Sequence, residues 1–233
     1  LPPVKSVTQE VETIGGVKYS REMEIEDLAQ AIPMHLDYLL FDACLMGCVE
    51  VAYEIKDICD IVGFSPTEVL ADGFVYSTLT QRLLKGSNPD PIGVISDFYA
   101  QYEGSSSPYC TASVVDCSKM DRLAEVCSRL FEKYRSQIRN VSPSRVQGYF
   151  RFNWHWFYDL KDILVQSGIS PEDLEELQEV LDDCVIYDEA TPQFLGFPIR
   201  THCGMSMYLP SNGSAQMSVY YRELAWNKAT NLL

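Results

Sequence analysis

The sequence has 233 residues, of which 46% are hydrophobic and 12% aromatic, so it can fill one large domain or a domain with a subdomain. That apolar content excludes a mainly disordered chain. Its 33 acidic and 18 basic residues give a net charge of −15, which argues against nucleic acid and against an anionic membrane surface as partners. The charge fits a positively charged partner or substrate, and no apolar run approaches the roughly 18 residues of a membrane span.

The first half of the chain is predicted to alternate strands and helices. Residues 1–22 are polar and are predicted to be an exposed loop or linker. They begin on Leu-Pro-Pro without Met, so we expect a processed or truncated chain. Apolar spacing predicts a short helix over 23–32, a buried strand over 36–42 and a helix over 45–59. Another short strand follows at 60–65 and leads into a long loop.

The second half is richer in helix. Residues 91–103 open with Pro at a helix start, 111–118 form a β-branched strand, and a long helix follows over 119–138. Alternating strands and helices predict βαβ units, so we expect an α/β fold with a mostly parallel sheet. The predicted organisation is a linker over 1–22, a first α/β region over 23–115, and a helix-rich C-terminal subdomain over 116–233 that contributes some strands.

Eight cysteines are present, without a CxxC pair, so the usual redox and zinc-ribbon signatures are missing. Most lie among apolar neighbours, and six or seven of the eight are predicted to be small buried hydrophobes. Cys44 differs because it follows a predicted buried strand and precedes a predicted helix. Sites in parallel sheets form at the carboxyl ends of strands, and a helix N-terminus favours a thiolate. Cys44 is therefore a candidate nucleophile.

Other roles for Cys44 were weighed against its neighbours. A phosphatase loop needs Arg six positions further on, where Glu50 stands, and a radical iron–sulfur site needs a third close Cys, where Val51 stands. Cys44 and Cys48 are spaced to share a helix face, but a metal needs two further ligands and none is close in sequence. A structural role for Cys44 stays open, since free cysteines are most often simply buried.

A longer pattern around Cys44 is more specific. The segment LDYLLFDACLMGCVEVAYEIKD (36–57) resembles the nucleophile segment of the clostripain family of cysteine peptidases, in the caspase-like clan. That family carries an Asp-Ala-Cys-Leu/Tyr-Met-Gly motif followed by Val-Glu-Val-Ala-Tyr or close variants. SPTEVLADGFVY (65–76) resembles its next block, and the similarity continues through SVVDCSKMDRLA, YDLKDIL and CGMSMYLP. The resemblance covers almost the whole chain and implies a caspase-like αβα sandwich, with 23–115 as its catalytic region.

The resemblance implies a cysteine endopeptidase that cleaves after Arg or Lys in protein or peptide substrates. Cys44 matches the family nucleophile, and Asp42 and Asp72 match positions that line the specificity pocket. Carboxylates suit that role because a buried guanidinium or ammonium must be paired. The plainer alternatives are a hydrogen-bonded acid at the strand end for Asp42 and a turn acid before Gly73 for Asp72.

A thiol peptidase of this kind also needs a histidine as proton donor. His35 stands at the far end of the predicted strand, more than about 20 Å from Cys44 at the usual rise per residue. His155 lies in an aromatic cluster, and nothing in the sequence supports His202. In the family the catalytic histidine precedes the cysteine by several dozen residues, so we expect it upstream, on a smaller N-terminal chain.

Clostripain-like enzymes mature by internal cleavage after a basic residue, so this chain resembles the larger, Cys-bearing piece. Lys18 above all, then Arg21 and Lys5, are candidate cleavage sites, unless they are ordinary loop charges. By resemblance the protein is secreted or in the cell envelope, and calcium is a candidate cofactor. No residue is assigned to a metal, because an EF-hand pattern is absent. The acidic runs 172–173 and 182–183 are interpreted as solvated helix faces.

Three rival functions remain open at this point. The first is a catalytically inactive caspase-like domain used for binding, which the missing histidine favours. The second is a hydrolase of the same architecture that prefers acidic or aliphatic side chains. The third is a structural domain in which the Cys44 thiol is unreactive at neutral pH.

Overall fold

The computed structural model describes residues 9–14, 17–84, 86, 88–152 and 155–233. Within them the helices are α1 (Ile25–Ala31), α2 (Val49–Ile55), α3 (Tyr76–Leu84), α4 (Pro91–Ala100), α5 (Met120–Asn140), α6 (Leu160–Gln166), α7 (Pro171–Cys184), α8 (Ala215–Tyr221) and α9 (Ala225–Thr230). The strands are β1 (Gln9–Ile14), β2 (Val17–Glu22), β3 (Leu36–Leu40), β4 (Cys59–Phe64), β5 (Thr111–Asp116), β6 (Phe157–Asp159), β7 (Val185–Ala190), β8 (Gln193–Phe194), β9 (Phe197–Pro198) and β10 (Ser206–Tyr208).

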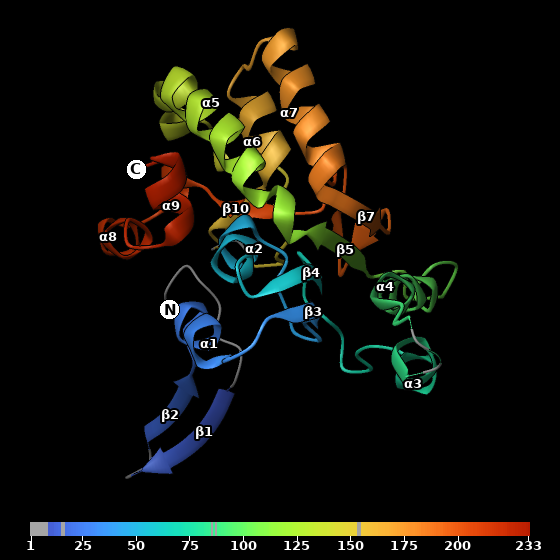
Figure 1. Cartoon of the computed structure of the whole chain (residues 1–233). Helices are drawn as coiled ribbons and strands as arrows, with labels where there is room; N and C mark the ends of the chain where they lie inside the picture. Colours follow the sequence, from blue (N-terminus) through green and yellow to red (C-terminus); the bar gives the residue numbers. More distant parts are fainter. Residues whose placement is uncertain (1–8, 15–16, 85, 87, 153–154) are drawn as a thin grey trace.

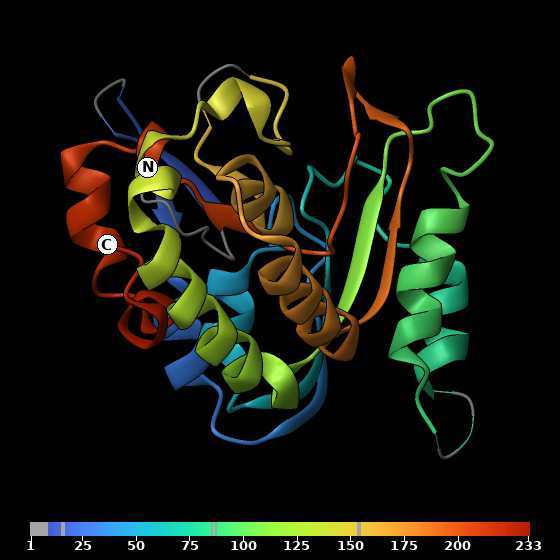
Figure 2. The same cartoon turned by 90° about the horizontal axis from the view of Figure 1, so that it is seen from above.

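Four strands form the central sheet in the order β3-β4-β5-β7 (Figure 1). β3 and β4 are parallel, whereas β4 with β5 and β5 with β7 are antiparallel. The prediction of a mostly parallel sheet is therefore wrong, and the sheet is mixed. The reason lies between β4 and β5, where the chain passes through two helices, α3 and α4, packed side by side (Figure 2). One helix leads away from the sheet edge and the other returns to it, so β5 starts where β4 ends.

Helices cover both faces of this sheet (Figure 2). One face packs against α3 and α4, and the other against the larger group that includes α2, α5, α6 and α7. β5 contributes to the hydrophobic cores on both faces of the sheet. Val114 belongs to the smaller core, next to α3 and α4, and Val115 to the larger core on the other face. This is the alternation of a strand that is buried on both sides. Among the described residues, no helix has both the length and the apolar character needed to cross a bilayer.

The N-terminal region differs from the predicted loop. β1 and β2 pair as an antiparallel hairpin, with Gln9 opposite Glu22 and Ile14 opposite Val17. This hairpin pairs with no strand of the central sheet. The two strands were not predicted because both are rich in charged and polar residues, a composition that is typical of loops.

Strands from both sides of the predicted division between residues 115 and 116 are neighbours in the central sheet. β5 ends at Asp116, and its neighbour β7 comes from the C-terminal part of the chain. The larger core likewise holds side chains from both parts, such as Val49 of α2 and Leu130 of α5. The C-terminal part therefore supplies helices to the fold and one strand, β7, to the central sheet.

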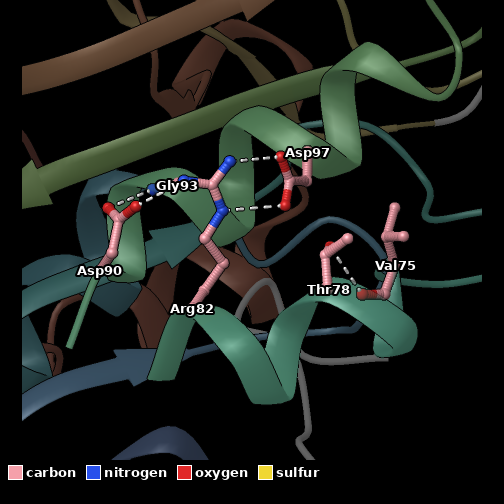
Figure 3. A network of polar contacts seen from close by, with 6 residues as sticks. All are labelled: Val75, Thr78, Arg82, Asp90, Gly93 and Asp97. Carbon is pink, nitrogen blue, oxygen red and sulfur yellow. Dashed lines mark hydrogen bonds and ion pairs between the residues drawn. The ribbon is translucent and has the colours of Figure 1, made fainter. Parts of the chain in front are cut away.

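Arg82 ties α3 to α4 (Figure 3). Its guanidinium donates twice to Asp97, from Nε at 3.1 Å and from Nη2 at 2.8 Å, and once to Asp90, from Nη1 at 2.8 Å. Asp90 also caps α4 by accepting the Gly93 N–H at 2.8 Å. A fork of this kind fixes direction as well as distance. The guanidinium correspondingly lowers the pKa of Asp97.

The hydrogen bonds of Arg82 to Asp97 and Asp90 matter because α3 has no fully buried side chain of its own. We expect Arg82→Met to loosen α3 without unfolding the sheet, since Met keeps the aliphatic stem and removes the three hydrogen bonds. Native-state hydrogen exchange should show amide protection over Tyr76–Leu84 falling roughly tenfold, while that of β3 and β4 stays the same.

Arg122→Met is the matched control, because Arg122 makes an exposed ion pair with Glu125 on α5, away from α3 and α4. Unchanged hydrogen exchange over α3 in the Arg82 variant would show that the Arg82 hydrogen bonds do not stabilise this helix.

Candidate active site

One thiol of this protein is exposed. All eight cysteines are described and none forms a disulfide; Cys44 is exposed and the other seven are buried. The prediction that most are small buried hydrophobes is therefore confirmed. Cys48, four positions further on, is fully buried at the start of α2, as a packing residue should be.

Cys44 lies in the turn that follows β3. Its Sγ accepts a hydrogen bond from the Val69 N–H at 3.3 Å and lies 3.4 Å from the Val69 carbonyl oxygen. The next residue, Leu45, has a left-handed φ of +62°, which is uncommon for a side chain of this size. The sulfur is thus presented from a constrained turn against the backbone of a neighbouring loop.

The expected role of the helix N-terminus is not what the structure shows. α2 begins only at Val49, with Cys48 as its first flanking residue, so Cys44 lies outside the first helical turn. Residues 44–47 are not part of the helix because their backbone groups bond to the loop after β4. Leu45 N–H donates to the Thr67 carbonyl at 2.7 Å, and Gly47 N–H donates to the Ser65 carbonyl at 2.9 Å. The polar group beside the sulfur is the Val69 N–H instead.

Gly47 is the residue that allows this close approach. A Cβ there would lie 2.4 Å from the Pro66 nitrogen, so no larger residue fits without moving the backbone. Its carbonyl accepts from both the backbone N–H and the hydroxyl of Ser206, at 2.9 and 3.0 Å. The glycine of the sequence motif therefore joins three segments: the turn after β3, the loop after β4, and β10.

Asp42 and its neighbours form the second feature of the site. The exposed Asp42 carboxylate accepts the Phe74 N–H at 3.2 Å and the Tyr76 hydroxyl at 2.5 Å, both at Oδ2. The hydrogen bond to Asp42 raises the pKa of Tyr76. Gly73 has a φ of +62°, and a Cβ there would lie 2.6 Å from Asp42 Oδ2. The loop after β4 is thus shaped around this carboxylate.

Asp72 is exposed and belongs to the same loop, one residue before Gly73. Its charge and that of Asp42 both act on Tyr102, whose pKa burial raises first and these carboxylates raise further. Because Gly73 lies against the Asp42 carboxylate, the preceding residue, Asp72, is brought to the same edge of the sheet as Asp42. Nothing here assigns them a ligand.

Sequence reasoning missed Val69, Tyr76 and Tyr102. Val69 acts through its backbone, which no side-chain pattern reveals. Tyr76 stood in a quoted motif block, but its contact with Asp42 spans 34 positions. Tyr102 comes from the end of a helix that only the tertiary fold brings to this edge.

The three histidines make contacts elsewhere. His35 is exposed and lies 2.8 Å from Asp60, whose hydrogen bond raises the pKa of His35. Both stand near the starts of β3 and β4, at the edge of the sheet opposite to Cys44.

The other two histidines are packed. His155 bonds through Nδ1 to the Phe152 carbonyl at 2.8 Å, and burial lowers its pKa. His202 is buried edge-on against the Tyr149 ring, 5.7 Å between centroids, with its Nδ1 3.7 Å from Asp188. The hydrogen bonds of the Cys44 thiol involve none of the three.

The predicted processing residues lie in the N-terminal hairpin or before it. Lys5 is outside the described residues. Lys18 and Arg21 are both in β2, where their backbones are opposite Thr13 and Glu10 of β1. A protease must bind its substrate in an unpaired, extended form, so cleavage at either residue requires this hairpin to open.

The described residues contain no group of three or more His, Cys, Asp or Glu side chains placed to hold a metal. The acidic runs 172–173 and 182–183 lie on α7, as expected for solvated faces of a helix. Glu172, Asp182 and Asp183 are exposed, and Asp173 is engaged by Lys133 at 2.5 Å. These residues do not fit a calcium cage, and no chemical step is assigned to calcium.

The chain was compared with known proteins. No curated protein matches it. Among solved structures, it superposes on an inactive zymogen C11 protease from Parabacteroides distasonis with 32% identity and a TM-score of 0.81, covering 89% of this chain and 62% of that one. A clostripain from Bacteroides thetaiotaomicron in complex with the peptide inhibitor BTN-VLTK-AOMK gives 29% identity and a TM-score of 0.78, covering 90% and 95%. A secreted C11 cysteine protease from the same species, "iotapain", gives 28% and 0.78, covering 90% and 60%.

This chain thus spans less than two thirds of the length of the first and third of these relatives. The sequence profile of the clostripain family matches residues 16–231, which include the Cys44 turn, the loop with Asp72, and β10. The chain belongs to the clostripain family.

Proposed function

We propose that this chain is the nucleophile-bearing part of a cysteine endopeptidase that cleaves after Arg or Lys. The observation that carries the proposal is the single exposed thiol, Cys44, held against the Val69 N–H at the carboxyl edge of the sheet. Family membership and the solved C11 proteases among the neighbours support it. The helices on both faces of the sheet agree with a caspase-like sandwich.

In this mechanism Cys44 Sγ attacks the carbonyl carbon of the scissile bond. A C–S bond forms as the C–N bond breaks, and the amine leaves with a proton from a histidine. Water then hydrolyses the thioester and regenerates the thiol. The Cys44 N–H is a suitable oxyanion donor, because within the described residues no hydrogen bond engages it. The Val69 backbone, whose N–H donates to Cys44 Sγ and whose carbonyl lies 3.4 Å from it, holds the sulfur in place for the attack.

The histidine in this proposal comes from an upstream segment or from a smaller N-terminal chain. His35, His155 and His202 each contact other groups, as described above. The partner chain would complete the active site by placing the imidazole beside the exposed face of Cys44. The protein is proposed to be secreted or in the cell envelope, as one solved neighbour is described as secreted.

The basic side chain of the substrate would bind beside Asp42 and Asp72. Within the described residues both hydrogen bonds to Asp42 reach Oδ2, which leaves Oδ1 for a ligand. Two carboxylates in one place match a guanidinium or ammonium in charge and in hydrogen-bond demand. The inhibitor of the solved Bacteroides thetaiotaomicron clostripain has the peptide part VLTK, whose last residue is lysine.

Irreversible labelling tests the nucleophile. A peptidyl arginine chloromethylketone, added to the protein expressed from its complete gene, should alkylate Cys44 and abolish peptide hydrolysis. Cys44→Ala should show neither labelling nor turnover, because the attacking thiolate is gone. Tryptic mass spectrometry locates the label.

Labelling on a cysteine other than Cys44, or hydrolysis by the Cys44→Ala variant, would contradict the assignment. An inactive binding domain predicts no labelling of the wild type. A structural thiol predicts that Cys44 resists iodoacetamide at neutral pH.

Self-processing is tested on the same variant. If Cys44 cuts its own precursor, Cys44→Ala should remain a single chain, whereas the wild type yields a new N-terminus after Lys18, Arg21 or Lys5. Intact-mass spectrometry measures both. Identical cleavage of the two proteins would show that another protease performs the cut.

The pocket acids are tested by Asp72→Asn and Asp42→Asn. Each should reduce kcat/KM for substrates with Arg or Lys by about 10–100-fold, the effect of losing a charge-assisted hydrogen bond of about 1.5–3 kcal/mol. Asp37→Asn, an exposed acid on β3, serves as the matched control. Undiminished cleavage after Arg and Lys by both variants would favour a hydrolase of other side chains.

A further inference from the structure

Three buried hydroxyls lie beneath the loop that holds the thiol. They belong to Ser65 and Thr67, which follow β4, and to Thr111, the first residue of β5. All three residues are buried, with at most 1% of their surface exposed. Burying a hydroxyl costs free energy unless it is hydrogen-bonded, so a group of three away from water indicates that their mutual hydrogen bonds matter.

Thr111 is the centre of this group. Its Oγ1 lies 3.0 Å from the hydroxyl oxygen of Ser65 and 3.0 Å from that of Thr67, and it accepts the backbone N–H of Thr67 at 3.0 Å. The Thr67 hydroxyl in turn donates to the Glu68 carbonyl at 3.2 Å. Thr111 can therefore donate to the Thr67 hydroxyl and accept from Ser65 and from the Thr67 N–H, which uses all of its hydrogen-bonding capacity.

The place of Thr111 in the sheet explains why a side chain makes these bonds. β4 and β5 pair through their backbones as far as Phe64, which is opposite Ser113. The next residues after β4 no longer pair with β5. The Thr111 hydroxyl holds this part of the chain to β5 where the backbone pairing has ended.

The backbone of the same segment bonds on its other side to the turn that contains Cys44. The carbonyls of Ser65 and Thr67 accept two backbone N–H groups of that turn, at 2.9 and 2.7 Å. Two residues further on, the Val69 N–H donates to Cys44 Sγ at 3.3 Å. Residues 65–69 thus lie between Thr111 and the thiol, and they are hydrogen-bonded to both.

We propose that Thr111 is a positioning residue for the reaction, whose hydroxyl holds residues 65–69 where their backbone fixes the Cys44 thiol. The proposal rests on the proposed function. Thr111 acts through the loop and takes no part in the chemical steps. A small displacement of a reacting group is enough to slow an enzyme strongly, so the effect falls on the rate of attack.

The candidate pocket acids are held by other contacts. Further along the loop, the Gly73 carbonyl accepts from Gln101 Nε2 at 2.8 Å, and the Phe74 N–H donates to Asp42 at 3.2 Å. Neither bond involves Thr111. Loss of its hydroxyl should therefore disturb the thiol more than the binding of a basic side chain.

Thr111→Val tests this inference, because valine keeps the β-branched shape and removes the hydrogen bonds. For a fluorogenic peptide with Arg before the scissile bond, cleaved by the protein from the complete gene, we expect kcat to fall about 10–100-fold. KM should change by less than about twofold. Thr111→Ser keeps the hydroxyl and should retain kcat to within about threefold of the wild type.

Thr230→Val is the matched control. Thr230 is equally buried, and its hydroxyl donates to the Trp226 carbonyl at 2.8 Å within α9. The control should keep the wild-type kcat, and thermal unfolding shows whether each variant is folded. If Thr111→Val does not fold, Ser65→Ala removes only one contact of the group, and kcat should then fall about threefold or more.

Hydrogen exchange gives a measurement that does not depend on peptidase activity. In Thr111→Val the Thr67 N–H loses its acceptor, so residues 65–69 should hold the turn less firmly. The amides of Leu45 and Gly47, which donate to this segment, should exchange about tenfold faster, whereas those of β3 should not change.

A kcat within about twofold of the wild type in folded Thr111→Val, or in Ser65→Ala where that variant is used, would overturn the inference. Equal losses in Thr230→Val would also overturn it, since they would indicate a general loss of stability, and so would a failure of Thr111→Ser to retain activity. A wild-type enzyme that cleaves no Arg or Lys peptide overturns the proposed function instead. Unchanged exchange at Leu45 and Gly47 would overturn the inference in either case.

Discussion

The site depends on one junction, where the chain leaves two parallel strands at the same edge of the sheet. Two backbone hydrogen bonds join the turn after β3 to the loop after β4, from Leu45 to Thr67 and from Gly47 to Ser65. They hold Cys44 against Val69 and bring Asp42 to Phe74. Because β3 and β4 are the parallel pair of the sheet, this is the edge at which the carboxyl ends of two neighbouring strands meet.

The two sides of the sheet support this junction differently. The larger core supports the Cys44 side through α2, where the buried Glu50 accepts the Tyr208 N–H at 2.9 Å and the Tyr221 hydroxyl at 2.7 Å. The smaller core fixes the loop of Asp72 through the ring row of Phe74 and Phe98. The Cys44 turn and the loop of Asp72 rest on separate groups of core residues, so each can be altered independently, provided that the backbone bonds between them stay intact.

Sequence reasoning succeeded where the information is local. The strand predicted over 36–42 is present as β3 because apolar runs are short-range signals, but it ends at Leu40 and its residues are half-buried or exposed, so the prediction that it is buried is wrong. The distinct position of Cys44 after this strand could be predicted for the same reason. The direction of β5 could not be predicted, because it depends on whether one helix or two lie between β4 and β5. The short connection between α3 and α4 does not indicate the direction of the strand that follows. The contact of Tyr76 with Asp42 arises only from long-range packing. The β1–β2 hairpin was missed because its polar composition resembles a loop.

Ser206 supports the carbonyl of Gly47 across 159 positions of sequence. A contact of this span forms late in folding, since closing so long a loop is entropically costly. During synthesis the turn with Cys44 would lack this support until residue 206 had left the ribosome and β10 had docked. The support of the Cys44 turn thus depends on a strand that follows it by more than 150 positions in the sequence.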